Sequence, residues 1–309
     1  MEKSKGVRLS HSASQTYIDC SEKYRLNYVD KIRPNTIPSF FFFGKKVESG
    51  LDVLLLRKKK NLTEEELELS KRCPKEVFDQ DFKNVEINGD ILDPRYTDRV
   101  VYFKSDFDAS ILTDEDEELL LEGMNEGWVS LRRKAHMMID AYEKEVLPEI
   151  EEVFSLQKEI ILPNEDGDYI IGYEDFQAKF KDGVTYICDN KTSSKPYKKD
   201  SVRLSEQFSP YSEYERNNNC AYIVIEKKIR VREPRVRISI IKDEVQESTK
   251  EAVFENFDIV LDGIKNNEYH KNYDSCGFGA IRCPYFNYCR TGDMKGLIDI
   301  KNKGKKDGE

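Results

Sequence analysis

Residues 172–192 read GYEDFQAKFKDGVTYICDNKT, and this stretch decides the fold that we expect. Strand-like residues lie on both sides of 181–183, whose sequence Lys-Asp-Gly is typical of a tight turn. Asp189 and Lys191 stand two residues apart on the second strand, so their side chains share one face. Pairing of the two strands can bring Asp175 beside them. The stretch therefore predicts a β-hairpin that carries two carboxylates and a lysine.

Such a group of charges indicates a metal site. Two carboxylates and a lysine are costly to bury on one sheet face without a cation. They suit Mg²⁺, a hard ion that takes carboxylate oxygens and water as ligands. Lys191 can then orient or deprotonate an attacking water, or stabilise charge that develops on a phosphate. A D-x-K tripeptide alone is common and usually faces solvent, so the interpretation depends on the flanking sequence.

The elements around the hairpin predict an α/β protein. Strands are expected over 157–162, 168–180, 185–188, 221–226 and 235–241. Helices are expected over 10–33, 40–57, 128–154 with a kink at Pro148, 204–217 and 243–264. The order favours a mixed central sheet flanked by helices, with a mainly helical insertion.

This order also gives a division of the chain. We assign residues 1–56 to N-terminal helices of the core, 57–156 to an acidic, mostly helical insertion, 157–290 to the core itself, and 291–309 to a charged, flexible tail.

Composition narrows the class of protein. The 309 residues are 38% hydrophobic and 35% charged, which is enough for a sizeable core. The net charge of −9 argues against a general nucleic-acid coat protein. No apolar run approaches the roughly 20 residues of a membrane span, and the N-terminus has no apolar signal core. We therefore expect a cytoplasmic protein without a membrane partner, located in the host cytoplasm if a phage encodes it.

Three short motifs together resemble a known family. They are G-x-x-D ending at Asp175, D-x-K-T from Asp189 to the residue after Lys191, and Q-x-x-x-Y from Gln207 to Tyr211. The series resembles the PD-(D/E)XK nuclease superfamily, and most of all its RecB-like branch, which includes the CRISPR-associated RecB-like exonucleases, AddB and eukaryotic exonuclease V. The resemblance implies a restriction-endonuclease-like core. It implies that Asp175 and Asp189 bind Mg²⁺ or Mn²⁺, that Lys191 is catalytic, and that Gln207 and Tyr211 line the site and contact DNA.

The same resemblance implies a function. It suggests an exonuclease on single-stranded DNA ends in repair, recombination or the processing of phage or foreign DNA, with a helicase, recombinase or integrase as a possible partner. We expect the basic loop after the catalytic strand to contact DNA phosphates. Its candidate residues are Lys195, Lys198, Lys199 and Arg203.

The N-terminal segment resembles the branch with two departures. The branch carries G-x-x-x-H, whose histidine is a further metal ligand, whereas this chain has Glu48 at that position after Gly44. Glu48 is therefore a candidate ligand, and a surface glutamate is the alternative. The sequence LSHSASQTYIDCSEKYRLNYV resembles the branch's opening helix, with Ser21 in place of a proline. Glu174 also replaces the proline that usually precedes the first acidic residue.

Four of the seven cysteines are candidates for a second metal site. Cys276, Cys283 and Cys289 lie within fourteen residues, and thiolates so close in sequence can reach one soft metal or cluster. The resemblance implies that they join Cys20 in holding a 4Fe–4S cluster that ties the two ends of the domain together. The gap before Cys283 is four residues wider than in the branch. Zinc is the alternative metal, and ordinary buried cysteines are the third reading.

Two alternatives to a nuclease stay open. One is a catalytically inactive DNA-binding or scaffold protein of the same fold, and the other is a zinc-stapled α/β protein. No phosphate-binding loop is visible, so we expect no ATP hydrolysis. The scattered histidines, His11, His136 and His270, are expected to be structural or exposed.

Overall fold

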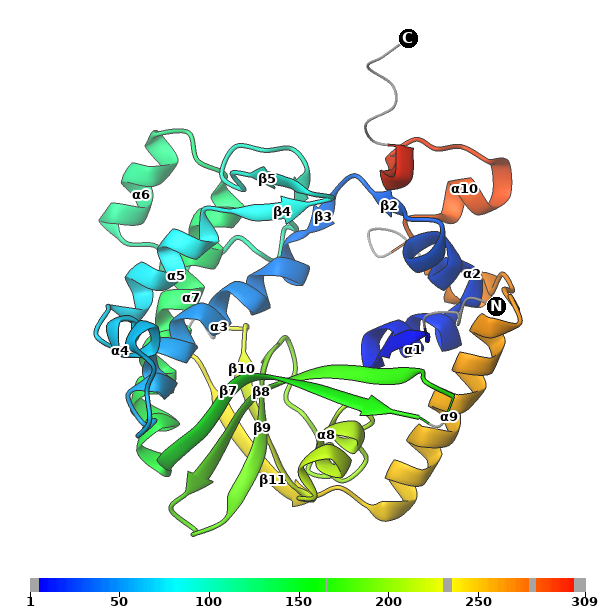
Figure 1. The fold of residues 1–309 in the computed structure, drawn as a ribbon. Helices are drawn as coiled ribbons and strands as arrows, with labels where there is room; N and C mark the ends of the chain where they lie inside the picture. Colours follow the sequence, from blue (N-terminus) through cyan, green and yellow to red (C-terminus); the bar gives the residue numbers. More distant parts are fainter. Residues whose placement is uncertain (1–5, 165, 230–234, 278–281, 303–309) are drawn as a thin grey trace.

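A mixed six-stranded sheet forms the centre of the computed structural model, which describes residues 6–164, 166–229, 235–277 and 282–302 (Figure 1). Its strands are β1 (Arg8–Ser10), β7 (Ile150–Pro163), β8 (Tyr169–Phe180), β9 (Thr185–Ser193), β10 (Asn219–Glu226) and β11 (Ile238–Glu244). The order is β1-β8-β9-β10-β11, and β7 pairs with β8. β1 runs parallel to β8 and β9 parallel to β10, whereas the other pairs are antiparallel. The expected mixed sheet is thus confirmed.

Helices cover both faces of this sheet. α3 (Ser39–Leu56) and α7 (Glu126–Glu145) pack on one face, in a core that includes Ala221 and Ile223. α8 (Phe208–Glu215) packs on the other, in a core that includes Cys220 and Tyr222. The neighbours on β10 alternate between these cores because successive side chains of a strand point to opposite faces. α9 (Glu247–Lys265) and α1 (His11–Asp19) form a third group near β1 (Figure 1).

The first expected helix is broken at Cys20. Ser10 caps α1 by accepting a hydrogen bond from the Ala13 amide at 3.2 Å. Cys20 adopts an extended conformation, and the chain continues as α2 (Ser21–Tyr24) and a π-helical turn, Arg25–Val29. The short strands β2 (Ile32–Pro34) and β3 (Ile37–Pro38) then lead to α3.

Residues 57–149 form a mainly helical layer on α3. Its elements are α4 (Glu64–Ser70), α5 (Pro74–Phe82), β4 (Val85–Ile87), β5 (Asp90–Leu92), β6 (Val100–Val101), a 3₁₀ turn (Ala109–Ile111), α6 (Asp114–Leu121), α7 and a 3₁₀ turn (Leu147–Glu149). Phe82 stacks on Trp128, whose indole N–H donates to the Phe82 carbonyl at 3.1 Å. Both residues share one hydrophobic core with Phe176 of the sheet. The layer and the sheet are therefore packed as one body.

The helix expected over 128–154 is too long. α7 ends at Glu145, Pro148 lies in a 3₁₀ turn, and β7 begins at Ile150. Proline cannot donate a helical hydrogen bond, and its ring disfavours the α conformation in the residue before it. The sheet consequently starts seven residues before the boundary expected at 157.

The C-terminal segment is more ordered than expected. After a 3₁₀ turn (Tyr273–Cys276) and α10 (Phe286–Thr291), β12 (Leu297–Asp299) pairs antiparallel with β2, and a 3₁₀ turn (Ile300–Asn302) follows. The Tyr285 hydroxyl donates to the Ile32 carbonyl at 2.9 Å. The expectation of a flexible tail is wrong for 297–302, because β12 finds an edge at β2, whereas 303–309 lie outside the described residues. Among the described helices, none has the length and apolar character to cross a membrane.

Candidate active site

The site lies where β8 and β9 separate. Their regular pairing runs from Lys179–Thr185 to Phe176–Cys188 and ends there. Beyond that point the Asn190 backbone N–H donates to the Asp175 carboxylate (Oδ2) at 2.7 Å instead of to a strand carbonyl. The split holds Asp175 at the mouth of the hairpin, next to the continuing strand that carries Asp189 and Lys191.

Asp189, Lys191 and Gln207 form a closed group. The Lys191 ammonium lies 2.7 Å from Asp189 Oδ2 and donates to Gln207 Oε1 at 2.8 Å. The Gln207 amide donates to Asp189 Oδ1 at 2.6 Å. Gln207 is the residue that precedes α8, so the start of this helix fixes its position. The structure thus brings together the D-x-K and Q-x-x-x-Y motifs.

The electrostatics keep Lys191 charged. Burial by itself lowers the pKa of Lys191, but the contact with the Asp189 carboxylate and the charge of Asp175 together outweigh burial and hold this pKa above its usual range. The lysine is therefore a cation in this arrangement, suited to stabilising negative charge.

Gly44 explains how α3 reaches the site. A Cβ at this position would lie 2.8 Å from Oγ1 of Thr192, the residue after Lys191 on β9. The absence of a side chain lets α3 approach β9 closely, and Glu48 follows one helical turn later. Burial, Asp52 and Asp189 raise the pKa of Glu48 to about 7. Glu48 is half-buried and lies within electrostatic range of Asp189.

Gly172 plays the same part for Tyr211. A Cβ on Gly172 would lie 2.5 Å from a ring carbon of Tyr211, so the buried ring packs directly over the strand backbone. This contact holds α8 against β8. The G-x-x-D and Q-x-x-x-Y motifs are therefore in direct contact, through Gly172 and Tyr211.

The carboxylates of Glu48, Asp175 and Asp189 are ligands of the type that a hard cation prefers. Burial and then Asp189 and Glu48 raise the pKa of Asp175 well above its usual range, and burial also raises that of Asp189. Such mutual repulsion is what a divalent cation would relieve. Among the residues that the structure describes, however, no three His, Cys, Asp or Glu side chains are placed to hold one ion. Asp189 is turned toward Lys191, and Asp175 toward the Asn190 amide.

Three nearby residues were missed by the sequence analysis. Burial raises the pKa of Asp52 to about 7, and Gln157 of β7 hydrogen-bonds its side chain. Asp52 stands four residues after Glu48, a helical spacing that could have revealed it. His11 lies close enough to Lys191 and Glu206 to respond to their charges, with burial lowering its pKa. Only the fold brings it there, so sequence spacing gave no signal.

The basic loop has mixed surroundings. Lys195, Lys198 and Lys199 are exposed after the end of β9. Arg203 is also exposed, but it pairs with Asp243 at 3.1 Å. The loop directly follows the strand that carries Asp189 and Lys191.

All four candidate cluster cysteines line one pocket. Cys20 comes from the break between α1 and α2, and Cys276, Cys283 and Cys289 come from the C-terminal segment. The pocket is small, with a volume of about 20 Å³. The Asn272 amide points at Cys20 Sγ at 3.5 Å, and the Cys283 amide donates to the Cys276 carbonyl at 2.7 Å. Both ends of the chain therefore meet at these thiols.

Comparison with known proteins gives one family. No curated protein matches the sequence. The family model of the PD-(D/E)XK nuclease superfamily matches residues 8–290. This range includes all the candidate site residues and all four pocket cysteines. Nucleases of this superfamily act on DNA and usually use Mg²⁺ or Mn²⁺. With Asp175, Asp189 and Lys191 gathered at the split between two strands, the chain belongs to the PD-(D/E)XK nuclease superfamily.

Proposed function

We propose that the protein is a Mg²⁺- or Mn²⁺-dependent DNA exonuclease of the RecB-like branch, acting on single-stranded ends. The observation that carries this proposal is the Asp189–Lys191–Gln207 group beside Asp175 and Glu48. A scaffold protein has no need to keep a buried carboxylate, a cation and an amide in mutual contact, because burying them is costly.

The residues divide the work of phosphodiester hydrolysis. Glu48, Asp175 and Asp189 would hold the metal, which supplies an activated water and polarises the phosphate when bound. Lys191 contributes a fixed positive charge that stabilises negative charge on the phosphate as the bond breaks. Gln207 positions Lys191 and Asp189 relative to each other through its two hydrogen bonds.

The proposal extends to partners and setting. Lys195, Lys198 and Lys199 would contact phosphates that flank the scissile bond, with Arg203 contributing if it leaves Asp243. A helicase, recombinase or integrase would supply the free ends, in DNA repair, recombination or the processing of phage or foreign DNA. These settings rest on the resemblance to the RecB-like branch.

A metal centre at the four cysteines is a further part of the proposal. Thiols from both ends of the chain line one pocket, which supports a shared metal, although among the described residues no three of them are placed to hold one ion. The resemblance to the RecB-like branch favours a 4Fe–4S cluster, and zinc is the alternative. Either would join Cys20 to the C-terminal segment as a structural tie.

The deciding experiment is cleavage of end-labelled DNA. Linear single strands, circular single strands and duplexes are incubated with Mg²⁺, Mn²⁺ or EDTA. We expect cleavage of linear single strands that needs the metal and is lost in Asp189→Asn and Lys191→Ala. The matched controls are Asp200→Asn and Lys181→Ala, exposed residues of the same types. Cleavage of circles would replace the exonuclease by an endonuclease. DNA binding without cleavage by the folded wild type under all conditions would favour the inactive scaffold.

A further inference from the structure

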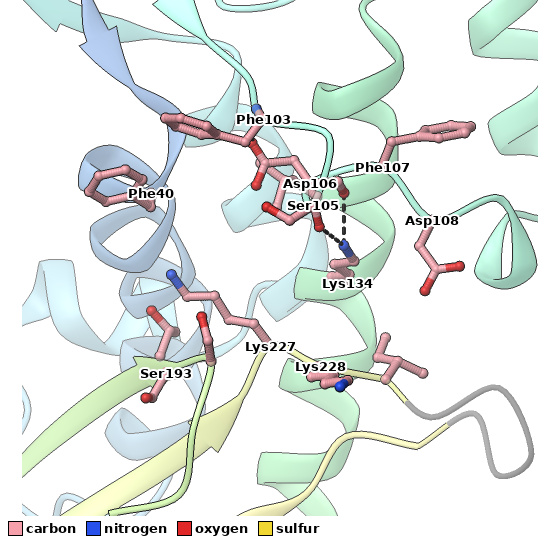
Figure 2. Close-up of a pocket in the computed structure, with 14 residues that line it drawn as sticks. Phe40, Phe103, Ser105, Asp106, Phe107, Asp108, Lys134, Ser193, Lys227 and Lys228 are labelled. Carbon is pink, nitrogen blue, oxygen red and sulfur yellow. Dashed lines mark hydrogen bonds between the residues drawn. The ribbon is translucent and has the colours of Figure 1, made fainter. Parts of the chain in front are cut away.

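A pocket of about 810 Å³ lies beside the catalytic strand, between the start of α3 and the loop 103–108 (Figure 2). Its floor is formed by the end of β9 and by the residues that follow β10, including Ser193 and Lys227. Its volume is in the range of pockets that hold a ligand. The loop belongs to the insertion, for which the sequence motifs gave no role.

Aromatic rings form one wall of the pocket. Phe40 is 43% exposed although it opens a helix whose later residues are buried. Its ring centre lies 5.6 Å from that of Phe103 and 4.7 Å from that of Phe41, and both neighbouring rings are tilted against it. Figure 2 shows Phe40 and Phe103 as neighbours from different elements. The exposed Phe40 ring, with the half-buried Phe103 ring beside it, offers a face on which a flat apolar group can stack.

Lysines form the opposite side. Lys227 extends toward the rings, 5.8 Å from the Phe43 ring centre, and Lys228 beside it is exposed (Figure 2). Within the described residues, neither has a salt bridge. Burial and then Lys134 lower the pKa of Lys227, against the opposing charge of Asp106. Three lysines line the pocket, Lys134, Lys227 and Lys228, against the two carboxylates of Asp106 and Asp108, so the side formed by Lys227 and Lys228 presents positive charge that a phosphate could compensate.

The loop is held in a fixed shape around this space. The buried Lys134 ammonium donates to the carbonyls of Ser105 and Asp106, at 3.3 and 2.7 Å. The Asp106 carboxylate accepts from the Ser39 hydroxyl at 2.6 Å and from the Phe103 amide at 2.8 Å. These bonds join the loop to both α3 and α7. The aromatic wall is thus preorganised.

The pocket adjoins the strand that carries Asp189 and Lys191. Thr192, Ser193 and Ser194 line it and directly follow Lys191 on the same chain. Ser193 is two residues from Lys191, about 7 Å along a strand. The Lys227 amide donates to the Ser193 carbonyl at 2.7 Å, which fixes the lysine beside β9. One DNA strand could therefore occupy the pocket and the catalytic site together.

We propose that this pocket binds an unpaired segment of the DNA substrate, whose bases stack on Phe40 and Phe103 and whose phosphates pair with Lys227 and Lys228. The inference rests on the proposed function, since it takes DNA as the substrate. Stacking on a side chain needs bases whose faces are free, so the pocket selects single strands over duplex. It also gives the insertion a function: to complete the binding site for the strand being cut.

The test is DNA binding without cleavage. A fluorescein-labelled oligo-dT is titrated in EDTA, and anisotropy gives Kd. Phe40→Ala and Phe103→Ala should each weaken binding about 5- to 150-fold, the loss usual for one stacked base. Binding of a duplex should change much less. Phe40→Trp should restore binding, which separates stacking from misfolding. The control is Phe154→Ala, an aromatic residue with a similar exposure of 45% on β7.

The lysines give an independent readout. Lys227→Ala and Lys228→Ala should each flatten the dependence of log K on log salt by about 0.7, the value for one phosphate of a single strand. Lys104→Ala, an exposed lysine of the same loop that does not line the pocket, should leave the slope unchanged. Phe40→Ala should weaken binding without changing the slope.

Two outcomes would overturn the inference. Either Phe40→Ala and Phe103→Ala weaken binding no more than Phe154→Ala, or they weaken duplex binding equally. Cleavage with Mg²⁺ is measured on the same proteins. Wild-type cleavage with unaffected binding in the phenylalanine variants contradicts the pocket but keeps the nuclease. Selective loss of single-strand binding without any wild-type cleavage keeps the pocket and contradicts the proposed nuclease.

Discussion

At the scale of single residues, Gln207 is the part of the site that holds two opposite charges in register. Its amide donates to Asp189, and its carbonyl oxygen accepts from Lys191. Hydrogen bonds to charged groups contribute about 1.5–3 kcal/mol each. We expect Gln207→Leu to reduce single-turnover cleavage by roughly 10- to 100-fold, because both charged groups lose their common partner. DNA binding in EDTA should fall far less.

The control for this prediction is Gln80→Leu, an exposed glutamine on α5. It should leave both cleavage and binding unchanged. If Gln207→Leu folds, as judged by its melting temperature, and cleaves as fast as the wild type, Gln207 has no positioning role. An equal loss of binding and cleavage would instead make it a DNA contact.

Asp52 gives a prediction about pH. Burial raises its pKa to about 7 in the folded protein, whereas an unfolded carboxyl titrates near pH 4. Between these values the folded state binds more protons, so the free energy of unfolding falls as pH rises. The free energy of unfolding of the wild type should fall between pH 5 and pH 8, and Asp52→Asn should make this fall smaller by about 1–3 kcal/mol. Urea denaturation in EDTA measures it. Glu65→Gln, an exposed carboxyl, should leave the fall as it is.

One outcome would contradict the prediction for Asp52. If Asp52→Asn is no more stable than the wild type at pH 8, the carboxyl is not held at a raised pKa. Part of the slope should remain in the variant, because burial and Asp189 also raise the pKa of Glu48.

The sequence predicted those parts of the site whose residues lie close together in the chain. Asp189 and Lys191 share a strand face by parity alone, and Gly44 and Glu48 are one helical turn apart. These positions follow from local geometry, so the motifs predicted them. His11 is far from Lys191 in the sequence and comes near it only in the folded chain, so no local spacing encodes their interaction. The pocket rings Phe40 and Phe103 likewise meet only through tertiary packing.

At the scale of elements, the helix expected over 40–57 is observed as α3 (Ser39–Leu56). Its apolar residues Val47, Leu51, Leu54 and Leu55 recur at helical spacing and are buried. Strong helical periodicity explains this success. The start of β7 was missed because Ile150–Leu156 follow a helix without a clear turn, and β12 was missed because three residues give no usable period.

The approach of α3 to β9 yields a prediction with an unusual sign. In an exposed helix, Gly→Ala stabilises by roughly 0.5–1 kcal/mol. Gly44→Ala should instead destabilise by about 1–3 kcal/mol and reduce cleavage, because its Cβ would lie 2.8 Å from Thr192 Oγ1. Removing that oxygen in Gly44→Ala/Thr192→Ala should restore stability and part of the activity.

Urea denaturation and cleavage of the two single variants and the double variant complete this cycle. Thr192→Ala alone is the reference for loss of the hydroxyl. If the double variant is as impaired as the sum of the singles, the close contact is not what requires glycine. If Gly44→Ala is more stable than the wild type, α3 lies farther from β9 than we describe.

At the scale of the whole molecule, the two ends of the chain close the fold. β12 pairs with β2, and the Asn272 side-chain amide donates to the Asp19 carbonyl at 2.9 Å. α1 carries His11 toward Lys191 and ends next to Cys20. A metal centre at Cys20 would therefore help to fix the position of α1, the helix that carries His11. The resemblance to the RecB-like branch implied this meeting of the ends, whereas the strand pairing that accompanies it has no sequence signature.

The last prediction concerns that tie. A metal centre joining Cys20 to Cys276 would close a loop of roughly 250 residues, and by analogy with a disulfide this stabilises by on the order of 4–5 kcal/mol at most. Cys20→Ser and Cys283→Ser should therefore lose bound metal and melt at a clearly lower temperature. Cys73→Ser, an exposed cysteine outside the pocket, should keep both. Metal content and visible absorption of protein purified without oxygen identify the centre. A brown protein with about four irons per chain indicates the cluster, and a colourless one with a single zinc indicates the alternative. If Cys283→Ser is metal-free yet as stable as Cys73→Ser, the thiols do not tie the ends together, and β12 with its partner strand must hold them alone.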